Sequence, residues 1–265
     1  MRLMIAAAAL IFAGIAWPAL ADDAMTPLIF GASSCTFNFF GPHATLEQAG
    51  LRSDLDLFLL LGDTSYNDGC SSVDDYRERW KMNFAKDGYR AIRAKTSLLA
   101  TWDDHEVGNN WSPETVDAGL LARATQVFFE HLPLRRIPGS PNRLWKRVRW
   151  GHTAEFFVLD GRSERLPSTR ETPGAVYLSR AQMDWLKASL ADSPAVFKIL
   201  LNSVPFANFP ASFDLGKVLL DPADRWQGYK AAQEELLQFI EETPVKGCVF
   251  VSGDFHLACA GKVSA

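Results

Sequence analysis

The sequence LDLFLLLGDTSY at Leu55–Tyr66 says most about the architecture of this chain. Its first part, Leu55–Leu61, is a short and largely apolar run, which favours a strand buried on both faces. Gly62 lets the backbone turn sharply where that strand ends. Asp63 is then expected at the carboxyl edge of a sheet, where α/β proteins place ligand sites, and Tyr66 follows one turn later. A plain Gly-Asp turn explains the motif equally well on its own.

Similar apolar runs recur along the chain, with helical patterns between them, and this alternation indicates a layered α/β fold. Two of the runs, joined across Gly151, predict an antiparallel hairpin and therefore a mixed sheet. The predicted strands are Leu28–Gly31, Leu55–Leu61, Ser97–Thr101, Trp145–Trp150, Thr153–Asp160, Phe197–Leu201 and Cys248–Val251. The predicted helices are Val73–Lys86, Pro113–His131 after the N-cap Ser112, Arg180–Leu190 after a capping box at Ser179, and Gln227–Glu242.

Potential metal ligands follow three further runs. Cys35 ends the motif SSC, WDDHE occupies residues 102–106, and GDFH ends with Asp254 and His256. Three carboxylates around His105 are costly unless cations or protons relieve their repulsion. Asp254 and His256 alternate by two, so an extended segment directs both to one side. The alternatives are, in the same order, a buried or disulfide-bonded cysteine, a solvated acidic loop and a hairpin turn.

Two more strand ends carry polar side chains. Asn202, in LLNS, places a carboxamide where a ligand could bind. Arg162, in LDGRSER, places a guanidinium where a phosphate could be held by two hydrogen bonds. Taken alone, such residues more often belong to a turn or a surface ion pair.

The composition is that of a globular protein without a nucleic-acid-binding surface. Of the 265 residues, 48% are hydrophobic and 22% are charged. The formal charge is −4, and no basic block stands out. We therefore expect a small-molecule substrate, and we expect the protein to be a monomer.

The beginning of the chain predicts export. Arg2, an apolar run and the cleavage motif Ala19-Leu20-Ala21 form a secretory signal peptide over residues 1–21, with a membrane anchor as the alternative. A periplasmic or secreted location without a membrane-spanning segment after cleavage follows from this. Export permits disulfides, but the spacing of the cysteines does not choose among three full pairings of Cys35, Cys70, Cys248 and Cys259.

In this order, the motifs SSC, GDTSY, DDHE, LNS and GDFH resemble those of the calcineurin-like metallophosphoesterase superfamily. The cysteine in the first motif, Tyr66 and WDDHE resemble its alkaline phosphatase D family in particular. The resemblance implies an α/β/β/α sandwich with mixed sheets over residues 22–265. Only nine residues follow His256, so strands at the C-terminus of that fold are expected to be missing.

The resemblance also implies two unequal metal sites that share Asp63. Cys35, Tyr66 and His256 would complete the first site, and a thiolate, a phenolate and an imidazole suit Fe³⁺. Asp104, Asn202 and Asp254 would complete an oxygen-only site, which suits calcium, with magnesium or manganese as alternatives.

The implied reaction is two-metal hydrolysis of a phosphomonoester or phosphodiester, with Asp63 and His105 as catalytic residues. His105 would protonate the leaving oxygen, and Arg162 and Asn110 are candidates for holding the phosphate. Two other hypotheses remain open at this point: an inactive periplasmic remnant that binds metal or phosphate, and an iron protein of redox function. The sequence does not distinguish monoester, diester and phospholipid substrates.

Overall fold

The computed structural model of the chain describes residues 27–37, 39, 41, 43–208, 222–256 and 260–263. The predicted signal peptide over residues 1–21 and Cys259 lie outside these residues. Within them, Cys35, Cys70 and Cys248 are free thiols. None of the helices in the described part of the chain has the length and apolar character needed to cross a bilayer.

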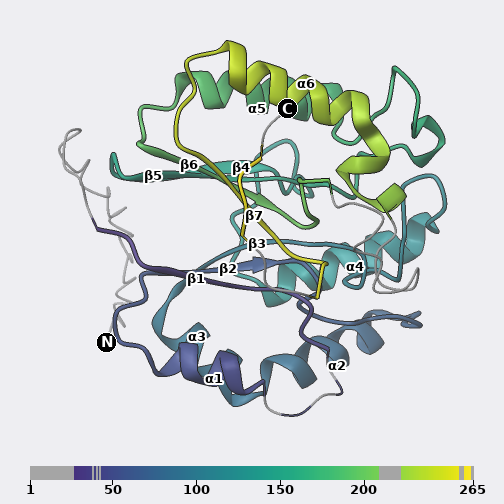
Figure 1. Cartoon of the computed structure of the whole chain (residues 1–265). Helices are drawn as coiled ribbons and strands as arrows, with labels where there is room; N and C mark the ends of the chain where they lie inside the picture. The colour runs from purple at the N-terminus through teal and green to yellow at the C-terminus, as the bar shows by residue number, and fades with distance from the viewer. Residues whose placement is uncertain are drawn as a thin grey trace, which may run out of the picture.

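Two sheets form the centre of the molecule (Figure 1). The first is entirely parallel and has the order β1-β2-β3, and the second has the order β4-β5-β6-β7. In the second sheet β4 and β5 form the predicted antiparallel hairpin, while β5, β6 and β7 are parallel. The strands are β1 (Phe30–Ser33), β2 (Leu57–Leu61), β3 (Ser97–Thr101), β4 (Lys146–Trp150), β5 (Ala154–Val158), β6 (Phe197–Asn202) and β7 (Cys248–Ser252).

Within the described residues, six α-helices cover the outer faces of the sheets, so the expected α/β/β/α layering is confirmed (Figure 1). One group of four packs on the first sheet through a cluster that includes Trp80, Tyr89 and Phe128. The other two pack on the second sheet. The helices are α1 (Ala44–Leu51), α2 (Val73–Phe84), α3 (Asp87–Lys95) and α4 (Ala118–His131) on the first sheet, and α5 (Arg180–Asp192) and α6 (Lys230–Glu242) on the second.

The continuous apolar run in β2 is explained by burial of both its faces. Leu57, Leu59 and Leu61 face the second sheet, in a cluster with Phe156 and Leu201. Phe58 and Leu60 face the helices. All five residues of the strand are buried, which is the pattern expected of a central parallel strand.

Two predicted helices begin later in the structure than in the sequence prediction. Hydrogen bonds between Ser112 and Thr115 hold a turn, and α4 begins only after Asp117, whose carboxylate accepts a hydrogen bond from the Leu120 amide at 2.7 Å. The last helix is preceded by a 3₁₀ turn, η4 (Trp226–Tyr229). The helices α1 and α3, with eight and nine residues respectively, were not predicted from the sequence.

The topology gathers the predicted ligands at one edge. Because β1, β2 and β3 are parallel, their carboxyl ends meet, and Cys35, Asp63 and Asp104 follow those ends. In the second sheet Asn202 ends β6 and pairs with Ser252 at the end of β7.

Candidate metal centre

Three predicted ligands from three different strand ends converge on one point. One ligand atom each from Cys35, Asp63 and His256 lies within 4.8 Å of the others. The Cys35 thiol donates to Asp63 Oδ2 at 3.6 Å. Cys35 and Asp63 follow strands β1 and β2 of the first sheet, and His256 follows β7 of the second. This group is therefore assembled across the sandwich. We call it the first ligand group.

A second ligand group shares Asp63. Ligand atoms of Asp63, Asp104 and His105 also lie within 4.8 Å of one another. The backbone amide of His105 donates to Asp63 Oδ1 at 3.4 Å and to Asp104 Oδ1 at 3.0 Å. Asp63 is 2% exposed and common to both groups, which is the position that a bridging carboxylate requires.

Two glycines allow these motifs to approach closely. A Cβ on Gly62 would lie 2.6 Å from Asp103 Cβ, and a Cβ on Gly253 would lie 2.6 Å from Ser34 Cβ and 2.7 Å from the Leu61 carbonyl oxygen. A side chain at either position would therefore push the strand ends apart.

The backbone at the centre is strained. Non-glycine residues with positive φ are uncommon, and they cluster at functional sites when the surrounding structure enforces them. Five of the predicted site residues have this conformation: Cys35 (φ 56°), Asp63 (φ 52°), Asn110 (φ 54°), Asp254 (φ 64°) and His256 (φ 53°).

The carboxylates repel one another in a buried space. Burial, together with Asp104 and Asp103, raises the pKa of Asp63 well above its ordinary value. Burial and Asp103 raise the pKa of Asp254 to about 7. Burial also raises the pKa of the Cys35 thiol to about 11. A bound cation relieves both the repulsion and the desolvation cost, and a thiol, an imidazole and carboxylates are ligands of borderline transition ions, so the donor set fits a metal site.

Glu106 has a different role from the acids beside it. Its carboxylate accepts hydrogen bonds from the backbone amides of Asp63 at 3.1 Å, Thr64 at 2.6 Å and Asp103 at 2.9 Å. Since Glu106 is 1% exposed, it ties the loop after β2 to the loop after β3 rather than facing the centre.

His105 is held on two sides. Its Nδ1 atom lies 2.7 Å from Asp68 Oδ2, and Asp68 Oδ1 accepts a hydrogen bond from the Asn109 amide at 2.6 Å. The Tyr66 ring stacks on the imidazole, with ring centroids 4.0 Å apart. Burial lowers the pKa of His105, but the hydrogen bond to Asp68 and the charge of Asp104 outweigh it and raise the pKa above the ordinary value.

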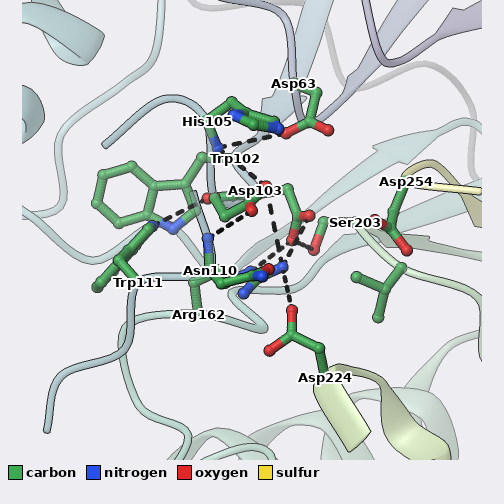
Figure 2. A network of polar contacts seen from close by, with 12 residues as sticks. Asp63, Trp102, Asp103, His105, Asn110, Trp111, Arg162, Ser203, Asp224 and Asp254 are labelled. Carbon is green, nitrogen blue, oxygen red and sulfur yellow. Dashed lines mark hydrogen bonds and ion pairs between the residues drawn. The ribbon is translucent and has the colours of Figure 1, made fainter. Parts of the chain in front are cut away.

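Arg162 lies in the interior, between two carboxylates (Figure 2). Its Nε and Nη2 atoms donate to Asp103 at 2.7 and 2.9 Å, and Nη2 also contacts Asp224 at 2.7 Å. Arg162 is only 1% exposed. In this arrangement it holds Asp103 and Asp224 rather than facing solvent. Asn110 is exposed, and its backbone amide donates to Asp104 Oδ2 at 2.7 Å.

Three predicted ligands are outside both ligand groups: Tyr66, which stacks on His105, and Asn202 and Asp254. Asn202 Oδ1 accepts a hydrogen bond from the Trp226 indole at 3.2 Å. Asp254 Oδ2 accepts one from Arg225 Nε at 2.8 Å. Both contacts come from the segment around η3 (Pro222–Asp224) and η4.

Sequence reasoning missed Asp68, Asp224, Arg225 and Trp226. Asp68 lies in the Asn-Asp-Gly turn five residues after Asp63, a spacing that could have identified it. The other three follow an irregular, proline-containing stretch, where no periodicity indicates which side chains point inward.

The chain matches known phosphatases over nearly all of its described residues. The sequence profile of PhoD-like phosphatases matches residues 29–265. Alkaline phosphatase D of Bacillus subtilis (strain 168) is 28% identical over 276 aligned positions, covering 89% of this chain and 47% of that protein. A solved structure of PhoD superposes with a TM-score of 0.78 at 26% identity, covering 89% of this chain and 52% of that one. The chain thus spans about half the length of the relatives it matches.

Proposed function

The chain belongs to the PhoD-like phosphatase family, and from this premise we propose that it hydrolyses phosphomonoesters, phosphodiesters or both with two cations that share Asp63. The observation that carries the proposal is the presence of Asp63 in both ligand groups. A carboxylate common to two groups of metal ligands is the arrangement expected of a two-metal hydrolase.

We propose iron for the first site, with Cys35, Asp63, Tyr66 and His256 as ligands. The convergence of Cys35, Asp63 and His256 supports this assignment. Tyr66, 8% exposed and packed on His105, lies next to the two ligand groups. Thiolate, phenolate and imidazole donors together favour a transition ion over a hard alkaline-earth ion.

We propose calcium, or else magnesium or manganese, for the oxygen-only site formed by Asp63, Asp104, Asn202 and Asp254. The proximity of Asp63 to Asp104 supports the first half of this set. Asn202 and Asp254 follow the neighbouring strands β6 and β7. Oxygen donors of this kind suit a hard divalent cation.

When bound, such cations polarise phosphoryl oxygens and lower the pKa of water. The chain supplies the remaining chemistry. With Nδ1 of His105 bound to Asp68, Nε2 is the atom available to donate a proton to the leaving oxygen. Asn110 is exposed beside Asp104 and is the better placed of the two phosphate-binding candidates, because Arg162 is buried between carboxylates.

Export to the periplasm or beyond the cell is part of the proposal and rests on the composition of residues 1–21 alone. N-terminal sequencing of the mature protein after expression in a bacterium tests it. A mature chain that begins at Asp22 supports cleavage after Ala21, and a retained Met1 contradicts it.

Metal analysis combined with an esterase assay tests the enzymatic function. We expect turnover of 4-nitrophenyl phosphate or bis(4-nitrophenyl) phosphate that is lost with a chelator and restored by metal. Asp63→Ala should lower kcat/KM by about 100-fold or more. Asp54→Ala, a surface change, is the matched control, since that carboxylate pairs with the exposed Arg52. Full activity of the Asp63 variant contradicts the proposal, and tight metal binding without turnover of any phosphoester identifies an inactive remnant instead.

A further inference from the structure

Three consecutive residues, Asp224, Arg225 and Trp226, each contact the carboxyl end of a different strand of the second sheet. Asp224 contacts Arg162, which follows β5. Arg225 contacts Asp254, which follows β7. Trp226 contacts Asn202, which ends β6. We call Asp224–Trp226 the crossing segment, because it spans the ends of three parallel strands.

The contact between Asp224 and Arg162 influences Asp104 through Asp103. Asp224 contacts Arg162 at 2.7 Å (Figure 2). It is also held by Arg165 at 2.7 Å and by Arg170 at 3.0 Å. Arg162 binds both carboxylate oxygens of Asp103, which also accepts a hydrogen bond from Ser203 at 2.8 Å. Since Asp103 directly precedes Asp104, a fixed Asp103 limits the positions that the Asp104 carboxylate can take.

The second contact orients Asp254. Arg225 is 5% exposed, and its guanidinium lies over the Phe255 ring at 5.0 Å from the centroid. It donates from Nε to Oδ2 of Asp254. A carboxylate has two oxygens, so a hydrogen bond to Oδ2 is compatible with a cation bound through Oδ1.

The third contact orients Asn202. The Trp226 ring is fully buried, and Tyr177 and Phe206 pack against it with centroids 4.0 and 5.0 Å away. An indole N–H is a donor only, so it selects the oxygen of the Asn202 side chain, while the amide nitrogen donates to the Val204 carbonyl. The selected oxygen keeps a second lone pair for a cation.

We propose that the crossing segment is the positioning element of the oxygen-only site, supplying the outer hydrogen-bond partners of Asp254 and Asn202 and, through Arg162 and Asp103, of Asp104. The inference rests on the proposed function for the existence of that site. Outer partners fix the orientation of metal ligands, and their loss typically weakens metal binding 10- to 100-fold. The contacts of the segment with Arg162, Asp254 and Asn202 all lead to ligands proposed for the oxygen-only site, while Arg225 also acts electrostatically on His256 of the first ligand group. The effect should therefore fall mainly on the metal of the oxygen-only site, and most selectively in the Trp226 variant.

Calcium titration calorimetry on the iron-loaded protein, with iron content measured on the same samples, tests the proposal. Trp226→Phe removes the indole donor and keeps most of the ring. Arg225→Gln removes the positive charge that lies beside the Asp254 carboxylate. We expect each variant to bind calcium about 10- to 100-fold more weakly while retaining the wild-type iron content. Arg225→Lys should bind more tightly than Arg225→Gln, because it restores a positive donor.

Two control variants match these changes in chemistry. Trp185→Phe alters a tryptophan that packs on Trp145, with centroids 4.9 Å apart. Arg180→Gln alters an arginine paired with Glu235 on the surface. Both should bind calcium as the wild type does.

The possible results distinguish the proposed function from the positioning role of the crossing segment. If the wild type binds none of calcium, magnesium and manganese, the oxygen-only site is removed from the proposed function and the positioning role falls with it. If the wild type binds calcium and both crossing-segment variants bind it equally well, the proposed function stands and the positioning role alone is overturned. Loss of iron together with calcium in both variants would also overturn it, since the segment would then support the fold as a whole.

Discussion

Nδ1 of His105 lies 2.7 Å from Oδ2 of Asp68, although the two residues are 37 positions apart in the chain. The contact leaves Nε2 as the imidazole nitrogen that is not bound to Asp68, and the negative charge stabilises the protonated ring. The pKa of Asp68 is correspondingly lowered: burial alone would raise it, but the hydrogen bond from His105 outweighs this. If His105 protonates the leaving oxygen, substitutions of His105 or Asp68 should slow hydrolysis most for substrates with poor leaving groups.

Asp68→Asn should lower kcat by about 10- to 100-fold, and His105→Ala by about 100-fold or more, because both weaken proton donation to the leaving oxygen. The loss should be larger for phenyl phosphate than for 4-nitrophenyl phosphate, whose leaving group needs less help. Asp87→Asn, which alters an exposed ion pair with Arg90, is the control. Equal losses on both substrates would contradict a role in protonation.

Cys35→Ser should remove iron selectively. A hydroxyl is a poorer ligand than a thiolate for a transition ion, and we expect iron affinity to fall by about 10-fold or more. Iron content after dialysis is the measurement. Cys248→Ser, at a half-buried thiol in β7 away from both ligand groups, should keep its iron. Wild-type iron content in the Cys35 variant would exclude the thiol as a ligand.

Glu106→Gln should destabilise the fold by about 3 kcal/mol. One of its two carboxylate oxygens becomes an amide nitrogen, which faces backbone amide donors in a fully buried position. Chemical denaturation in the presence of saturating metal measures this change. Glu47→Gln, on the first turn of α1, provides a comparison at a half-buried position. Wild-type stability of the Glu106 variant would show that the three hydrogen bonds contribute little.

The stability of the metal-free protein should fall as pH rises from about 4 to about 7. The pKa of Asp254 is about 7 in the folded protein against an ordinary value of 3.8. Across that range the folded state therefore holds a proton that the unfolded chain has lost, and each increase in pH favours unfolding.

The measurement is the Tm with a chelator and with saturating calcium, at pH 5 and pH 7.5. We expect the metal-free Tm to fall by about 5 °C between these values, with a smaller fall when cation is bound. In Asp254→Asn the metal-free fall should shrink. A metal-free Tm that rises over this interval would contradict the shifted pKa as the controlling factor.

Much of the fold could be predicted from the sequence. The buried run Leu57–Leu61, the hairpin across Gly151 and the helix after Ser179 follow from local patterns of apolar residues and caps, which are written in neighbouring positions. The helices α1 and α3 were missed because each is short, with only about two turns in which a periodicity can show.

Part of the first ligand group was also predictable. Cys35 and Asp63 directly follow neighbouring parallel strands of the first sheet, whose carboxyl ends lie at one edge. His256 follows β7 of the second sheet, so the packing of the two sheets brings it to the other two residues. Local sequence patterns thus indicated which residues follow the strand ends.

The contact partners of the residues at these strand ends, by contrast, depend on the folded structure. Arg162 looks like a phosphate ligand in sequence, yet it lies between Asp103 and Asp224, which are 59 and 62 positions away along the chain. Arg225 and Trp226 reach Asp254 and Asn202 from an irregular segment with no pattern of its own. A buried charge must find a partner wherever the packing of two sheets provides one, and that choice depends on three-dimensional proximity rather than on the order of residues.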